Sequence, residues 1–373
     1  MPFVFRRLRL ALGALALLAA PSLWAQIVVG QTADFSGPVS PSVKELTEGA
    51  RLYLDAVNAA GGIHGQKIEL VSLDDKFEPP RAAENARTLI EKNNVVALFL
   101  TRGTPHAQAV MPLIAEHKVP LVAPSTGAML LHEPVNRYIF NVRATYQREA
   151  ERAVRHLSLI GMERIGVLMV DDSFGADAAV GVQRGFAGVD RKPIVMDKFD
   201  RAKPEFGPLV QALVKADAQS VLIIGSATAV ATGTKALRDA GSRAQVVTLS
   251  NNAAGGFIKL LGEHARGTIV SQIFPYERSL AAPIVKEASD LARAKGNADV
   301  SPAMLEGFAS AKVLVEGLRR AGPGPTRAKL QQALEGLRKF DLGGLEVTYG
   351  PNDHTGLDYA DLSIIGPDGK FRR

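Results

Sequence analysis

Short apolar runs alternate with longer segments of helical periodicity along most of the chain. The first run, 27–29, precedes a segment over 44–60 whose apolar residues recur every three or four positions, which is typical of an amphipathic helix. Gly61 and Gly62 predict its end, because glycine favours the backbone conformation that terminates helices. The same pattern predicts further helices at 81–92 and 107–116, and further strands at 67–73, 95–100, 119–123, 165–170, 194–199, 221–225, 246–249 and 268–274.

This alternation predicts an α/β fold. Strands that read as continuous apolar runs are typical of parallel sheets, which helices cover on both faces. The strands are too numerous for one open sheet, which favours two doubly wound parallel sheets. The pattern then changes, with two successive helices expected at 302–320 and 326–337 and strands at 345–349 and 359–365. Helices at this point indicate that the chain returns to the first lobe.

Residues 1–25 have the character of a secretory signal peptide. Three arginines precede an apolar run over 10–20, and Ala25 offers a small residue for cleavage before Gln26. A membrane anchor would need about 20 apolar residues, and this run is too short before Pro21. We therefore expect a cleaved leader and export to the periplasm.

Composition narrows the class of protein further. The chain contains no cysteine, so neither a disulfide framework nor a thiol-linked lipid anchor is expected, and the mature protein should be free in the periplasm. About 348 of the 373 residues follow the leader, enough for roughly two domains. The net charge of +6 falls to about +3 without the leader, and the basic residues are interspersed. Nucleic acid is therefore not an expected partner.

No motif of an enzymatic reaction is present in the sequence. The first strand leads into Gly30-Gln31-Thr32 rather than Gly-x-Gly-x-x-Gly, and both the Gly-Lys-Ser/Thr phosphate loop and the Gly-x-Ser-x-Gly elbow are missing. The seven histidines are scattered without His-x-x-x-His spacing, so we expect no metal and no cofactor. The chain is predicted not to be an enzyme. A secreted hydrolase or transferase is the weakest of the alternatives.

Small hydroxyl, amide and glycine residues follow five of the predicted strands. Backbone N–H groups and helix N-termini converge at the carboxyl ends of parallel strands, and ligands bind at that edge. Helix capping would explain any single loop. Five loops in matching positions favour an edge that holds a polar solute. These loops are 34–38, 101–105, 124–127, 171–175 and 250–252.

The chain resembles the leucine/isoleucine/valine-binding family of type I periplasmic solute-binding proteins. The resemblance covers essentially the whole mature chain. Its most specific part is Asn-x-x-Gly-Gly-Ile-x-Gly over 58–65, followed by Asp74 and Asp75. Further matching segments are 35–38, 49–50, 119–124, 138–143 and 171–175.

The resemblance implies two lobes that are joined by three crossovers and close on a ligand like a hinge. It implies the solute-binding component of an ABC importer, with a small carboxylate ligand and a permease in the inner membrane as partners, and we expect a monomer. A ligand sensor for a signalling receptor would use the same fold and remains the alternative. The expected crossovers are 141–145, 271–275 and 347–352, with lobe 1 at 26–142 plus 276–346 and lobe 2 at 143–275 plus 347–373.

By the same resemblance, hydroxyl and backbone groups of Thr104, Ser125 and Gly127 hold the ligand's carboxylate. Phe174 matches a family aromatic that covers the ligand from lobe 2, whereas Ser42 stands where the family often has an aromatic. The residues expected to bind the ligand are Ser42, Arg102, Gly103, Thr104, Ser125, Thr126, Gly127, Tyr146, Asp172, Phe174, Ser250 and Asn251.

The ligand itself stays open at this point. The family's acid for an α-ammonium should fall near Ser250 or Asn251, and neither is charged. A buried ammonium without a counter-ion is strongly unfavourable. Either another acid such as Asp172 takes this role, giving an amino-acid ligand, or the ligand is an amine-free organic acid. Arg102 is either a clamp on an acid or a solvated side chain, and Tyr146 either contacts the ligand or packs at the hinge.

Overall fold

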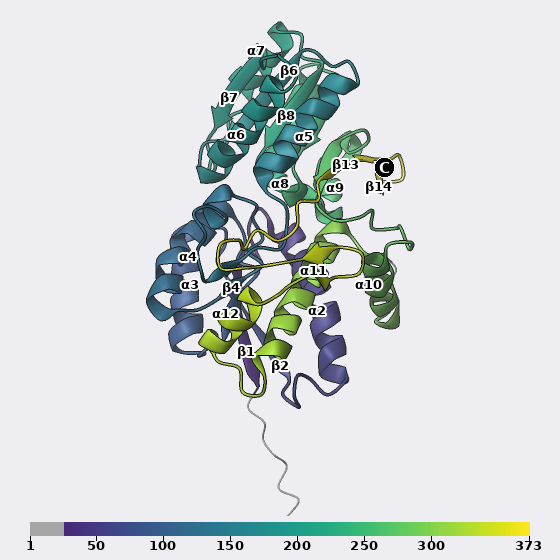
Figure 1. Cartoon of the computed structure of the whole chain (residues 1–373). Helices are drawn as coiled ribbons and strands as arrows, with labels where there is room; N and C mark the ends of the chain where they lie inside the picture. Colours follow the sequence, from purple (N-terminus) through teal and green to yellow (C-terminus); the bar gives the residue numbers. More distant parts are fainter. Residues whose placement is uncertain (1–25, 298) are drawn as a thin grey trace, which may run out of the picture.

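The computed structural model describes residues 26–297 and 299–373, which form two lobes around two sheets (Figure 1). The expected signal peptide lies outside the described residues. The first sheet has the order β2-β1-β3-β4-β5, and the second has the order β14-β13-β10-β9-β8-β6-β7. The strands of the first sheet are β1 Ile27–Ala33, β2 Ile68–Asp74, β3 Ala97–Phe99, β4 Leu121–Val122 and β5 Ile139–Phe140. The second-sheet strands are β6 Ile165–Val170, β7 Val195–Phe199, β8 Ser220–Ile224, β9 Gln245–Thr248, β10 Ile269–Gln272, β13 Asp361–Ile365 and β14 Phe371–Arg372.

Helices flank both sheets, and the predicted α/β fold of two doubly wound lobes is confirmed (Figure 1). The first-lobe helices are α2 Ser40–Ala59, α3 Pro79–Glu91, α4 Thr104–His117, α10 Pro283–Ala294, α11 Pro302–Ala321 and α12 Arg327–Glu335. The second-lobe helices are α5 Tyr146–Leu159, α6 Ser173–Ala187, α7 Gly207–Lys215, α8 Ala227–Asp239 and α9 Gly255–Leu261. No helix within the described ranges is long and apolar enough to span a membrane.

The first sheet separates two apolar layers because side chains alternate along each strand. Phe99 faces the layer formed with α2 and α11, whereas its neighbour Leu98 faces the layer formed with α3 and α4. Phe140 and Ile139 divide in the same way. Burial on both faces explains why these strands read as unbroken apolar runs rather than as alternating ones.

The strands of both sheets are parallel except β13 and β14, which run antiparallel at one edge of the second sheet. They reach it from the first lobe: Val347 and Leu357 are buried in the first-lobe core, and β13 begins at Asp361. This packing favours a third crossover near 358–360, later than the limit at 346–347 expected from the sequence. The other limits of the two lobes stay predictions.

The short elements differ most from the sequence-based expectation. Strand β5, strand β11 Phe340–Asp341, strand β14 and helix α10 are not predicted individually, whereas β12 Glu346–Val347, which pairs with β11, lies inside the strand predicted at 345–349. Helices α2 and α4 begin three or four residues earlier than expected, because each starts next to a proline that suits the first helical turn.

Helices α2 and α11 cross in close contact through two glycines. A Cβ added at Gly49 would overlap the carbonyl oxygen of Met304, and one added at Gly307 would overlap the carbonyl oxygen of Leu46. Both obstacles are backbone atoms, so no side-chain rotation can relieve them. The two glycines therefore set the distance between the helices that build the first-lobe core.

Replacing Gly307 with alanine should destabilise the first lobe by about 1–3 kcal/mol, since an extra methyl group in this crossing forces the helices apart. Urea unfolding followed by circular dichroism measures the change. Gly207→Ala is the matched control, because a Cβ there meets no atom within 4 Å and should leave stability unchanged or slightly raised. Equal midpoints for the two variants would contradict this account of the crossing.

Candidate functional site

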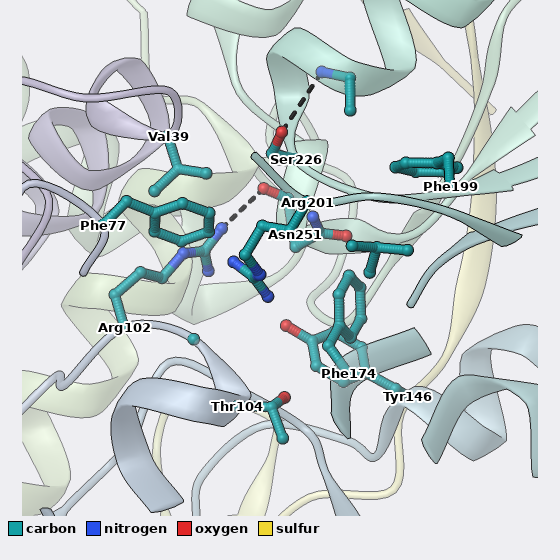
Figure 2. A pocket seen from close by; sticks show the side chains of 13 residues that line it. Val39, Phe77, Arg102, Thr104, Tyr146, Phe174, Phe199, Arg201, Ser226 and Asn251 are labelled. Atoms are coloured by element: carbon teal, nitrogen blue, oxygen red, sulfur yellow. Dashed lines mark hydrogen bonds between the residues drawn. The ribbon is translucent and has the colours of Figure 1, made fainter. Parts of the chain in front are cut away.

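A cavity that is partly open to solvent lies between the two lobes (Figure 2). We call it the interlobe cavity. Both lobes line it, mostly with residues that follow the carboxyl ends of strands. The lining residues are Val39, Phe77, Arg102, Gly103, Thr104, Tyr146, Val170, Phe174, Phe199, Arg201, Ser226, Ala229 and Asn251.

Arg102 enters the interlobe cavity from the first lobe and is only 5% exposed. Its guanidinium donates to the Ser125 hydroxyl at 2.8 Å and to the backbone carbonyl of Asn251 in the second lobe at 2.8 Å. A longer bond of 3.4 Å reaches the Ser42 hydroxyl. All these acceptors are neutral, and Arg102 forms no ion pair with an acid of the described chain. A buried cation held in this way is suited to an anion.

Helix α4 points its N-terminus at the same space. Gly103 precedes the helix with a φ of 97°, a left-handed conformation that favours glycine, and it supplies no side-chain cap. Thr104, the first helical residue, lines the cavity, and its hydroxyl shares a 2.8 Å hydrogen bond with the hydroxyl of Thr126. Uncapped backbone N–H groups at a helix start attract anions, so this end of the cavity is electropositive.

The second lobe contributes an aromatic wall and a polar acceptor. The rings of Tyr146 and Phe174 pack with their centroids 4.6 Å apart, and both are buried. Beside them, the amide nitrogen of Asn251 donates to the carbonyl of Gly225 at 2.9 Å, which fixes the orientation of the side chain. Its oxygen Oδ1 is buried without a hydrogen-bond partner within the described chain. A ligand group that donates a hydrogen bond could satisfy it.

A buried ionic network lies behind this wall. Arg143, 1% exposed, ion-pairs with Glu149 and lies 3.8 Å from Glu306. It also donates to the Ser250 hydroxyl at 2.8 Å. The Ser125 hydroxyl donates to Glu306 at 2.7 Å. The two serines are thus held by charged neighbours and do not line the cavity.

Arg201, from the loop after β7, was not expected at the site. It ion-pairs with Asp172, whose other oxygen accepts from the backbone N–H groups of Phe174 and Gly175 at the start of α6. The Arg201 guanidinium also stacks over the Phe77 ring, 4.6 Å from its centroid. Asp172 is therefore engaged twice and does not line the cavity.

The structure brings half of the expected ligand-binding residues to the cavity wall. These are Arg102, Gly103, Thr104, Tyr146, Phe174 and Asn251. The other half lies behind the wall, bonded to lining residues or to the ionic network: Ser42, Ser125, Thr126, Gly127, Asp172 and Ser250. A direct contact of any of the twelve with a ligand stays a prediction.

Seven lining residues are absent from the sequence-based set. Ser226 caps α8 directly after an apolar strand, a signal that could have placed it at the same sheet edge as the five loops. Phe77 and Arg201 lie in loops with no such signal, and Phe77 has a φ of 64°, rare for a residue other than glycine. The remaining four are Val39, Val170, Phe199 and Ala229.

A buried acid and a buried histidine lie behind Phe77. The His106 ring stacks on Phe77 with centroids 4.8 Å apart, and its Nε2 lies 4.0 Å from the Asp75 carboxylate. Burial raises the pKa of Asp75 to about 7. Burial, together with the positive charge of Arg201, lowers the pKa of His106 to about 3. No group of three or more potential metal ligands occurs among the residues placed by the structure.

Comparison with known proteins identifies similar chains along almost the whole length. The model of the family described as periplasmic binding protein matches residues 26–363. The Leu/Ile/Val-binding protein homolog 3 of Brucella melitensis is 25% identical over 339 residues, covering 88% of this chain and 89% of that protein.

Two solved structures share the fold closely. The substrate-binding periplasmic protein of Ralstonia solanacearum has a TM-score of 0.83 and 33% identity, covering 93% of this chain and 99% of that one. The possible leucine/isoleucine/valine-binding protein of Rhodopirellula baltica has a TM-score of 0.87 and 25% identity, covering 95% and 98%.

The Asp75–His106 pair predicts a specific pH dependence of stability. A raised Asp75 pKa makes the folded state lose stability as pH rises from about 4 to about 7, because only the folded state keeps the proton there. A lowered His106 pKa makes it lose stability as pH falls from about 6.5 to about 3. Between pH 4 and 6.5 the two effects oppose each other in the wild type.

Single substitutions should separate the pH effects of Asp75 and His106 on stability. Relative to wild type, His106→Gln should lose stability as pH rises through this range, and Asp75→Asn should lose it as pH falls, each by up to about 1.4 kcal/mol per pH unit. Urea unfolding at a series of pH values between 4 and 7 measures both slopes. Slopes of the same sign in the two variants would refute the assignment.

Proposed function

The chain belongs to the periplasmic binding protein family that includes the Leu/Ile/Val-binding proteins, and on that basis we propose that it captures a small carboxylate for an ATP-driven importer. The capture takes place in the interlobe cavity, in the periplasm, and the loaded protein docks on a membrane permease. The role is binding and release without chemical conversion. The fold and the family support this role. The buried Arg102 supports a negative charge on the ligand.

The observation that carries the choice of ligand is the charge of the cavity lining. Two of its thirteen residues are arginines, and none is an aspartate or a glutamate. Arg102 is buried against neutral acceptors only, so an anionic ligand would supply its missing counter-ion. The uncapped start of α4 adds donors on the same side.

The same lining argues against an α-ammonium group on the ligand. Asp172 is engaged by Arg201 and by the start of α6, and Glu149 and Glu306 face Arg143 behind the wall. Among the residues that the structure describes, no acid is therefore left in the cavity to receive an ammonium. Asn251 Oδ1 offers a neutral acceptor instead, which suits a hydroxyl group.

Most of the remaining lining is apolar, from Val39 and Phe77 in the first lobe to Val170, Phe174 and Phe199 in the second. Such surfaces bind the hydrocarbon body of a solute, while a few polar groups set its orientation. The ligand proposed is thus an amine-free carboxylic acid with an aliphatic or aromatic body, and a hydroxyl is the substituent that best fits Asn251.

Arg102→Gln should weaken binding of such acids roughly 10- to 100-fold, the usual effect of losing a charge-assisted hydrogen bond. Isothermal titration calorimetry measures the affinity, and the melting temperature reports whether the fold is retained. Arg87→Gln, which removes an exposed first-lobe arginine paired with Glu91, is the matched control and should bind normally. Unchanged affinity in the Arg102 variant would place the anion elsewhere.

Acids with the same carbon skeleton that carry an amino, hydroxyl or oxo group at carbon 2 test whether the ligand lacks an ammonium group. The two series are leucine, 2-hydroxy-4-methylpentanoate and 4-methyl-2-oxopentanoate, and phenylalanine, 3-phenyllactate and phenylpyruvate. In at least one series the hydroxy acid should bind about tenfold or more tighter than the amino acid. Asn251→Asp should narrow or reverse that preference, because it places a carboxylate in the cavity. Tighter binding of the amino acids by the wild type would refute the amine-free ligand.

A further inference from the structure

Arg201 brings a second positive charge to the interlobe cavity, from the lobe opposite Arg102. It lies in the loop between β7 and α7, and its side chain is 23% exposed. Figure 2 shows both guanidinium groups directed into the cavity beside Phe77. The two lobes thus present like charges to one space.

Like charges in a partly desolvated space repel each other, and closure of the lobes brings them together. Asp172 offsets part of the charge of Arg201, but it does not itself line the cavity. Arg102 has no acidic partner of its own. An anion placed between the two arginines would therefore turn a repulsion across the cleft into two attractions.

The Arg201 side chain is also held in position before any ligand arrives. Asp172, which binds it, is itself fixed by the backbone N–H groups of Phe174 and Gly175 at 2.8 and 3.1 Å. The Phe77 ring of the first lobe packs on the guanidinium face from across the cleft, 4.6 Å from ring centroid to guanidinium. The ion pair with Asp172 thus places the guanidinium at the cavity wall.

We propose that Arg201 is an anion-binding residue of the second lobe, which shares the ligand's carboxylate with Arg102 and thereby couples binding of an acid to closure. This inference rests on the proposed function and adds to it the residue that makes closure selective for anions. Arg102 fixes the acid in the open protein. Arg201 reaches it only as the second lobe closes.

The test compares three second-lobe variants with 3-phenyllactate and 2-hydroxy-4-methylpentanoate as probes. Arg201→Gln removes the charge and should weaken binding roughly 10- to 100-fold. Asp172→Asn keeps the helix cap, because asparagine caps as well as aspartate, and it removes the acid that competes for Arg201. It should therefore bind the acids as tightly as wild type or tighter. Lys203→Gln, exposed in the same loop, is the matched control and should bind normally.

The opposite effects expected of Arg201→Gln and Asp172→Asn separate a ligand contact from a structural ion pair. If the pair only supports the fold, the two variants should lose affinity alike, and this result would overturn the inference. Unchanged affinity in Arg201→Gln would overturn it as well. If wild type binds neither probe, both the inference and the proposed function fail. If wild type binds and only the Arg201 prediction fails, the proposed function stands.

Small-angle X-ray scattering supplies a second readout that a mere loss of contact would not change. Wild type should become more compact when saturated with the probe that binds it. Arg201→Gln, saturated at a correspondingly higher concentration of the same probe, should remain closer to the dimensions of the free protein. Full compaction of the saturated variant would show that Arg201 does not couple binding to closure.

Discussion

The arrangement of the site depends on one buried cation, Arg143, at the first crossover between the lobes. An arginine that is 1% exposed must be fully paired, because an uncompensated charge in the interior is strongly unfavourable. Glu149, from the first turn of a second-lobe helix, and Glu306, from a first-lobe helix, meet this requirement together. The pairing ties residues that lie far apart in the sequence to one point at the hinge.

This network determines which polar groups remain for a ligand. Ser250 and Ser125 have the residue type and the position expected of ligand contacts, yet their hydroxyls bond to Arg143 and Glu306. Ser125 in turn accepts from Arg102 and so helps to hold that guanidinium at the cavity. The hinge and the cavity therefore share one set of hydrogen bonds. The groups of that set that line the cavity, such as the Arg102 guanidinium, are cationic or neutral. The acidic ligand that we propose follows from the way these charges are paired.

Local patterns along the sequence were sufficient to predict the fold and only part of the site. Apolar runs and helical periodicity identify most elements, because burial on both faces of a parallel sheet leaves a continuous signal. Two-residue strands such as β5 carry too little signal, since neighbouring strands rather than their own residues define them. The residues that line the cavity are harder to predict from local patterns. Phe77 and Arg201 reach it from loops without a motif, and their meeting depends on how the two lobes face each other.

The closure that we propose can respond to a ligand because the lobes share no apolar core. The buried apolar clusters of the two lobes contain different residues, so separating the lobes exposes neither interior. Hydrogen bonds join the lobes across the cleft, such as those from Gly255 and Gly256 to Glu45 and from the backbone of Met129 to Asp177. Each contributes only about 1–3 kcal/mol, since water replaces it when the cleft opens. The balance between open and closed forms is then small enough for neutralisation of a few charges in the cavity to decide it.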